Sequence, residues 1–403
     1  MKPTRITNLP YYCRVQRIHR KSIQLAKVTT TFSVQNSSKV PLSTEKNSLK
    51  SVPNDTSTTI TTTTTATTTT TTPRVWVTTG SLSTSRESHT ASVLNSGKVL
   101  VTGGYNGAFL TTTELYDPAT GNWTIVGALT TGRNSHTASI LTNGSVLVAG
   151  GNDGSALNSA ELYNSMTNTW TITGNINDAR AGPVSVTLTN GKVLILGGNG
   201  NSGYLNTAEL YNPSTGIWTR TGNMNNARTN PTAVLLTNGK VLALGGYDGG
   251  YLNTAELYDL STGNWTTTGS MNVARDPPAV CILTDERVLA TGGETSGGVI
   301  LNSAELYDPS TGTWTTTGNM SISRKGPTAS LLTNGTVLVV GGYSGSTYFN
   351  TTELYSPSTG LWTAGPSMHT ARGYYAASTL LDGTVMASGG TNGGSIVNSV
   401  ELY

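Results

Sequence analysis

The chain has 403 residues, of which 11% are charged, and its formal net charge of +3 hides two segments of opposite sign. Residues 1–73 hold ten Lys/Arg and two acidic residues, a balance of +8, whereas residues 74–403 hold fourteen and nineteen, a balance of −5. The larger segment is mildly acidic, which excludes nucleic-acid binding driven by its overall charge.

Residues 1–73 are predicted to be a basic tail followed by a Thr-rich linker. Residues 1–27 contain seven Lys/Arg and no acidic residue, and residues 56–72 are almost all threonine. A threonine tract buries too little apolar area to offset its ordering entropy, so disorder is expected. The basic start has the character of a mitochondrial transit peptide, but a disordered tail is the interpretation we prefer. No apolar run suggests a secretory signal or a transmembrane helix.

The sequence leaves the compartment open between the cell exterior and the cytoplasm, with a mitochondrial location less favoured. Thr-rich tracts are typical of O-glycosylated stalks, and Asn-x-Ser/Thr sequons recur, for example at Asn122 and Asn264. Both features favour the exterior. The lack of a visible secretory signal favours the cytoplasm.

Residues 74–403 repeat one unit seven times. Glycine pairs recur every 47 to 49 residues, and seven tryptophans and seven Glu-Leu-Tyr triplets keep the same period. A fixed period of this length indicates a repeat architecture. The pairs are Gly103–Gly104, Gly150–Gly151, Gly197–Gly198, Gly245–Gly246, Gly292–Gly293, Gly341–Gly342 and Gly389–Gly390.

The unit over residues 228–265 is predicted to form four strands. The first covers Thr232–Leu236, and an Asn-Gly turn follows whose two residues both accept positive φ. The second, Lys240–Leu244, is apolar on successive residues, which is typical of a strand covered on both faces. The third covers Thr254–Tyr258, and Trp265 begins the fourth.

Four strands in about 47 residues correspond to one blade of a β-propeller, so the fold class is all-β with seven blades. The first strands carry small residues such as Ala233, which suit a crowded centre, whereas Tyr and Trp can fill the wider rim. The fifth repeat has Asp285-Glu286 in place of Asn-Gly, so we predict a different turn there.

The two ends of the repeat region are predicted to close the ring. The chain enters with a lone fourth-strand unit at Trp76 and ends at Tyr403, just after a third strand. Residues 75–79 should therefore pair with residues 399–403 and complete the last blade, which leaves no unpaired edge.

These landmarks resemble kelch repeats: an apolar run, a glycine pair, a spaced Tyr and a Trp in each of seven copies over residues 74–403. The resemblance implies a β-propeller whose usual role is to bind other proteins. Galactose oxidase, a kelch-type copper enzyme whose site uses two Tyr and two His with one Tyr joined to Cys, is the comparison from another functional class.

Two histidines could approach a metal in such an enzyme. His89 and His136 each lie three residues after a repeat arginine, and Cys281 is the one thiol of residues 74–403. They are more simply strand-entry residues, because a metal site needs three or four ligands. We therefore expect no metal and no other cofactor.

One arginine and one glutamate recur at a fixed phase in every repeat. This pattern indicates one structural ion pair in each blade or blade junction rather than an anion-binding ring. The arginines are Arg86, Arg133, Arg180, Arg228, Arg275, Arg324 and Arg372, and the glutamates are Glu114, Glu161, Glu209, Glu256, Glu305, Glu353 and Glu401.

The variable loops between second and third strands, with the residues just after each arginine, are predicted to form a ligand-binding face. Their Tyr, Gly, Ser and Asn suit an adaptable surface, although plain solvated loops are the alternative. The candidates are Tyr105, Asn106, Phe109, Asn134, Asp153, Tyr204, Tyr247, Asp248, Tyr251, Asp276, Lys325, Tyr343, Tyr348 and Tyr374.

The function predicted from these features is that of a non-catalytic binding or scaffold protein with a protein partner. The alternatives are a galactose-oxidase-like copper enzyme and a carbohydrate-binding propeller with a glycan ligand. A complete catalytic constellation is not visible, so we expect no enzyme activity.

Overall fold

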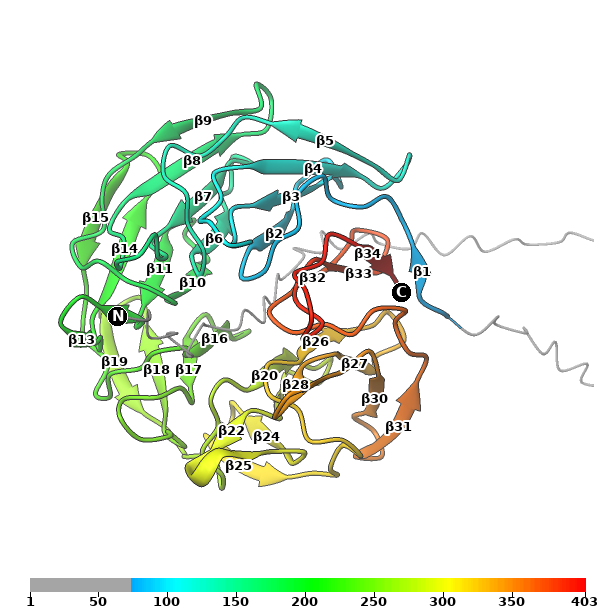
Figure 1. Ribbon diagram of the computed structural model, residues 1–403. Coiled ribbons are helices and arrows are strands. Elements are labelled where there is room, and N and C mark those ends of the chain that lie inside the picture. The colour runs from blue at the N-terminus through cyan, green and yellow to red at the C-terminus, as the bar shows by residue number, and fades with distance from the viewer. Residues whose placement is uncertain (1–73) are drawn as a thin grey trace, which may run out of the picture. The chain divides into compact units, whose positions relative to one another are not determined.

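The computed structural model describes residues 74–403, and the predictions for residues 1–73 lie outside this part. The described chain forms seven four-stranded antiparallel sheets that follow one another around a ring (Figure 1). The innermost strands of neighbouring sheets contact each other all the way round, including the last with the first. The seven-bladed propeller predicted from the repeat is confirmed.

Each blade begins with its innermost strand. Blades 1 to 3 consist of β2 (Thr90–Val93), β3 (Val99–Thr102), β4 (Thr113–Asp117) and β5 (Asn122–Val126); β6 (Thr137–Ile140), β7 (Val146–Ala149), β8 (Ala160–Asn164) and β9 (Thr169–Ile172); and β10 (Val184–Thr187), β11 (Val193–Leu196), β14 (Ala208–Asn212) and β15 (Ile217–Arg220).

The remaining blades keep the same order. Blades 4 to 7 consist of β16 (Thr232–Leu235), β17 (Val241–Leu244), β18 (Ala255–Asp259) and β19 (Asn264–Thr267); β20 (Ala279–Ile282), β21 (Val288–Thr291), β24 (Ala304–Asp308) and β25 (Thr313–Thr316); β26 (Thr328–Leu331), β27 (Val337–Val340), β30 (Thr352–Ser356) and β31 (Leu361–Gly365); and β32 (Ala376–Thr379), β33 (Val385–Ser388), β34 (Val400–Leu402) and β1 (Val77–Thr78).

Three of the loops between second and third strands contain a short β-hairpin. They are β12 (Asn199–Gly200) with β13 (Gly203–Tyr204), β22 (Glu294–Thr295) with β23 (Val299–Ile300), and β28 (Tyr343–Ser344) with β29 (Thr347–Tyr348). The 3-10 turn η1 (Ser296–Gly298) joins β22 to β23.

The core lies between blades, where second strands are covered on both faces. Every residue of β17 is fully buried, which explains its continuous apolar run. The repeat Tyr and Trp stand opposite each other farther out, as in Tyr258↔Trp265, and their ring centroids lie 5.2 Å apart. The predicted gradient from small inner residues to aromatic outer residues is confirmed.

The glycine pairs are required by close approach between blades. Gly245 and Gly246 have φ of 61° and 92°, and a Cβ on Gly245 would lie 2.6 Å from the carbonyl oxygen of Arg275 in the next blade. An L side chain is excluded there by both conformation and space. The second glycine donates its N–H to that same Arg275 oxygen at 3.0 Å.

Two details of the turn prediction are wrong. In the turn at residues 236–240 only Gly239 has positive φ. The Gly239 N–H donates to the Leu236 carbonyl, and the two residues between them, Thr237 and Asn238, keep negative φ. The fifth repeat keeps the same turn. Glu286 takes the glycine position with φ 71° and donates its N–H to the Leu283 carbonyl.

The predicted ring closure is confirmed. Val77 pairs with Leu402 and Thr78 pairs with Glu401, so β1 forms the outer strand of blade 7. The Trp76 ring packs 5.3 Å from the Tyr403 ring and is 3% exposed. Residues 76–78 therefore bring both a hydrogen-bonded edge strand and a buried indole to the last blade.

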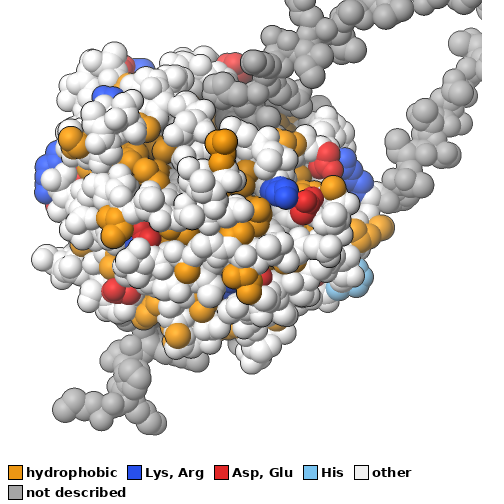
Figure 2. All heavy atoms as spheres, turned by 90° about the horizontal axis from the view of Figure 1, so that it is seen from above, with side chains coloured by type: hydrophobic (Ala, Val, Ile, Leu, Met, Phe, Trp, Pro, Cys, Tyr) orange, Lys and Arg blue, Asp and Glu red, His pale blue; other side chains and the backbone are white. Residues whose placement is uncertain are grey.

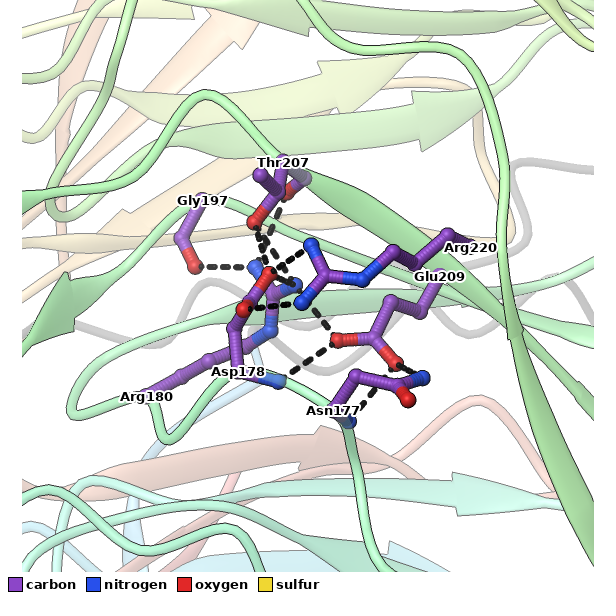
Figure 3. Close-up of polar contacts among 7 residues, drawn as sticks. All are labelled: Asn177, Asp178, Arg180, Gly197, Thr207, Glu209 and Arg220. Atoms are coloured by element: carbon purple, nitrogen blue, oxygen red, sulfur yellow. Dashed lines mark hydrogen bonds and ion pairs between the residues drawn. The ribbon is translucent and has the colours of Figure 1, made fainter.

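The predicted ion pair occurs inside all seven blades, with N···O distances from 2.7 to 3.2 Å. In blade 3 the Arg180 guanidinium donates to the carbonyls of Gly197 and Thr207 and to Glu209 Oε1 (Figure 3). The second Glu209 oxygen accepts the N–H of Asn177 at 2.9 Å, from the connection that arrives from blade 2. The pair therefore ties each blade to the segment that enters it.

Outside these buried pairs the propeller carries few charges. Figure 2 shows scattered Lys, Arg, Asp and Glu side chains among uncharged ones, and apolar side chains in small groups. Residues 74–403 contain no helix of the length and apolar character needed to cross a membrane.

Candidate functional site

The loop face is the side of the propeller that carries the second-to-third-strand loops and the connections between blades. On this face the residue after each repeat arginine forms a β-bridge with the residue after each glycine pair. The bridges are Glu87↔Tyr105, Asn134↔Asn152, Ala181↔Asn199, Thr229↔Tyr247, Asp276↔Glu294, Lys325↔Tyr343 and Gly373↔Thr391. The two kinds of position from which the candidates were drawn therefore adjoin each other in every blade, and in the bridge Lys325↔Tyr343 both residues are candidates.

Three groups of aromatic candidates are in ring contact on the loop face. Tyr105 lies 5.4 Å from Phe109 in blade 1. Tyr247 lies 5.7 Å from Tyr204 and 5.3 Å from Tyr251, which joins blades 3 and 4.

The third group joins blades 6 and 7. Tyr343 stacks on Tyr348 at 5.3 Å and on Tyr374 at 5.7 Å, and the hydroxyls of Tyr343 and Tyr374 are 3.1 Å apart. All three rings are half-buried. Mutual stacking holds the three rings in place.

Tyr374 adopts a conformation that is unusual for a bulky residue. Its φ is 53°, and the residue two places after the arginine has positive φ in five other blades as well, where it is Ser88, Ser135, Gly182, Asn230 and Gly326. A tyrosine is strained in this region, where glycine is not. The exception is Pro277 of blade 5, whose ring fixes φ at a negative value.

Three candidates at loop tips have a local structural role. The side-chain oxygens of Asn106, Asp153 and Asp248 each accept a backbone N–H two residues later, at 3.4, 3.3 and 3.2 Å. These Asx turns shape the exposed tips. The structure does not bring the three side chains together.

The polar candidates Asp276 and Lys325 both adjoin Glu294, Asp276 through a backbone bridge and Lys325 through an ion pair. We use the name blade 5 cluster for Asn230, Tyr251, Asp276, Glu294 and Lys325. Lys325 Nζ is paired with Glu294 Oε2, and both Asp276 and Lys325 are buried, at 5% and 8% exposure. Asn134, on the other side of the ring, is also buried, and its Oδ1 has no hydrogen-bond partner among the described residues.

Burial dominates the electrostatics of the blade 5 cluster. Desolvation raises the pKa of Asp276 to about 7, an effect that Lys325 and Asn230 oppose and Glu294 reinforces. Desolvation, together with a hydrogen bond to Glu294, raises the pKa of Tyr251 to about 12. Tyr251 is therefore a neutral donor to Glu294, and Asp276 changes charge near neutral pH.

The sequence matches two kelch profiles. The profile described as "KLHDC2/KLHL20/DRC7 Kelch-repeats domain" matches residues 124–278, and the "Kelch motif" profile matches residues 88–130, 277–321 and 324–369. The chain belongs to the kelch-repeat β-propeller family.

Among solved structures, this kelch propeller is similar to one described as a novel fungal alcohol oxidase with catalytic diversity among the AA5 family, in complex with copper. The two are 20% identical with a TM-score of 0.68 over 81% of this chain and 75% of that chain. At that identity the likeness concerns the fold alone. No curated protein matches the sequence.

His89 and His136 of the kelch propeller are held between different pairs of blades. His89 Nε2 lies 3.2 Å from Ser388 Oγ in blade 7, and His136 Nε2 lies 2.9 Å from Thr90 Oγ1 in blade 1. Both rings are fully buried, as expected of strand-entry residues. Within residues 74–403, no three His, Cys, Asp or Glu side chains gather as metal ligands would.

Sequence reasoning missed two members of the blade 5 cluster, Asn230 and Glu294. Both stand at positions that vary among the repeats, where conformity to the repeat gives no signal. A usable signal was present in repeat five, where acidic residues follow both the arginine and the glycine pair, as Asp276 and Glu294. The β-bridge between Asp276 and Glu294 places these two acidic residues next to each other in space.

Proposed function

We propose that this kelch propeller is a non-catalytic binding module whose loop face holds a partner protein. The observation that carries the proposal is the set of aromatic groups on that face, above all the stack of Tyr343, Tyr348 and Tyr374. Half-buried tyrosines that already contact one another lose little conformational freedom when a partner covers them.

The composition and the fold both favour the loop face. Tyrosine anchors among Gly, Ser and Asn are characteristic of surfaces that bind proteins. The opposite face carries short turns of nearly one sequence, as in residues 237–240 and 333–336, and offers little to distinguish one partner from another. The exposed Asn238 and Asn334 side chains serve the turns themselves, because each accepts a backbone N–H two residues later.

Replacing the tyrosine stack should strongly reduce partner capture. The triple variant Tyr343→Ser, Tyr348→Ser, Tyr374→Gly removes the rings, and glycine is tolerated at residue 374 because Gly182 and Gly326 take the same place in blades 3 and 6. Aromatic anchors carry much of the energy of protein interfaces, so we expect captured partner to fall by roughly tenfold or more. The measurement is affinity capture with quantitative mass spectrometry, using the full chain as bait.

A matched control removes three exposed apolar side chains from the outer strands. Ile125, Ile217 and Leu361 are 66%, 56% and 63% exposed, and their replacement by serine should leave capture unchanged. If the triple tyrosine variant, folded by circular dichroism, captured the same proteins in the same amounts as the parent, the loop face would not be the binding surface.

A further inference from the structure

We propose that the blade 5 cluster binds the positively charged side chain of a lysine or arginine of the partner protein. The inference rests on the proposed function, because it supplies the chemistry by which the loop face would recognise that partner. The site is the Asp276 carboxylate together with the amide oxygen of Asn230, between the aromatic groups of blades 3–4 and blades 6–7.

One side-chain oxygen of each key residue lacks a hydrogen-bond partner within residues 74–403. Asp276 and Asn230 are each 5% exposed, and Oδ1 of each makes no hydrogen bond within the described residues 74–403. The Asn230 amide group hydrogen-bonds to the Asp276 carboxylate, so the two side chains face each other. A buried acceptor without a donor costs free energy, and a ligand that supplies N–H donors removes that cost.

The cation already present is engaged elsewhere. Lys325 Nζ is paired with Glu294, which also accepts a hydrogen bond from Tyr251. Two carboxylates and one ammonium leave the cluster with a formal charge of −1 when Asp276 is ionised. The neighbouring repeat arginines Arg228, Arg275 and Arg324 are each held by the glutamate of their own blade. The cluster therefore favours a cation and repels an anion.

The fold itself does not need an acid at residue 276. The equivalent residues of the other blades are Glu87, Asn134, Ala181, Thr229, Lys325 and Gly373, and their blades keep the same backbone bridge. The bridge Asp276↔Glu294 uses only main-chain atoms, with N···O distances of 2.9 and 3.0 Å. A buried carboxylate at this one place is better explained by a ligand than by architecture.

An aromatic ring beside the carboxylates adds to the case for a nitrogen cation. The Tyr251 hydroxyl hydrogen-bonds to Glu294, and Asp276 acts electrostatically on the same side chain. Ring faces attract ammonium and guanidinium groups. A neutral hydroxyl would bind a carboxylate more weakly than a cation does, because hydrogen bonds between charged groups are stronger than those of neutral donors.

The test uses small probes on the full chain. Titrations with n-butylammonium and n-propylguanidinium, followed by ligand-observed NMR at constant ionic strength, separate a lysine-like from an arginine-like ligand, and n-butanol is the neutral probe. We expect saturable binding of at least one cation and none of the alcohol. Asp276→Asn should lose it, whereas Asp382→Asn, a change of the same kind in an exposed turn of blade 7, should keep it.

Binding should also depend on pH in the unmodified protein. Asp276 is neutral well below its raised pKa of about 7 and ionised above it, with Lys325 and Glu294 as the charged groups that face it. Cation affinity should therefore rise by about tenfold or more between pH 5.5 and pH 8. This arm needs no variant and stays decisive if Asp276→Asn does not fold.

Four results would overturn the inference: no saturable cation binding, equal binding of n-butanol, affinity that does not change with pH, or full binding by a folded Asp276→Asn protein. The proposed function fails separately. If the triple tyrosine variant captured partner like the parent while Asp276→Asn lost the probe, the cation site would stand and the protein-binding role of the tyrosines would not.

Discussion

Deletion of residues 74–80 from the full chain should lower the melting temperature by on the order of 10 °C or more. The deletion removes the outer strand of blade 7, which pairs Val77 with Leu402, and takes Trp76 away from Tyr403. Loss of a buried tryptophan alone costs about 3–5 kcal/mol, and β34 becomes an unpaired edge. The measurement is a thermal melt followed by circular dichroism.

The matched control deletes seven residues of the Thr-rich tract, residues 61–67. This change shortens the chain by the same length and leaves β1 and its partners in place, so the melting temperature should stay within a degree or two of the parent. A melt of the 74–80 deletion that coincided with this control would show that β1 does not hold the ring closed.

Replacement of a repeat arginine should be nearly as damaging. Arg180→Met removes the guanidinium that neutralises Glu209 and donates to the carbonyls of Gly197 and Thr207 (Figure 3). Breaking a buried ion pair from one side costs about 3–5 kcal/mol, because the remaining charge stays buried without its counter-ion. The free energy of unfolding from urea titration measures the loss.

Arg220→Met in the same blade is the control. Arg220 pairs with Asp178 at 2.6 Å, but its side chain is 55% exposed, and such surface pairs contribute about 1 kcal/mol or less. We expect a clear separation between the two variants. Equal midpoints and slopes for Arg180→Met and the parent would contradict the structural role assigned to the seven arginines.

The repeat positions made most of the fold predictable. The second strand, predicted as Lys240–Leu244 and observed as Val241–Leu244, and the pairing of the two chain ends follow from periodicity, because the same contacts recur in every blade. The turn errors came from residue identity: Glu286 adopts the left-handed conformation that glycine has elsewhere, since the flanking strands fix the turn. The geometry that the flanking strands impose on the turn therefore outweighs the conformational preference of a single residue.

The candidate site was predictable only in part. Loop composition identified the tyrosines and Asp276, but not which of them would meet, since these contacts cross between blades and depend on the geometry of the ring. Tyr343 and Tyr374, from neighbouring repeats, stack because blades 6 and 7 bring them together. Asp153 and Asp248 were candidates beside Asp276, yet they cap their own loop tips.

Hydrogen–deuterium exchange of the full chain, alone and with its captured partner, tests the binding surface most directly. Partner binding should slow exchange in loop-face segments, above all residues 292–303 and 341–351, and leave the turns at residues 237–240 and 333–336 unchanged. Protection confined to those turns, with the loop-face segments exchanging as in the free protein, would contradict recognition by the loop face.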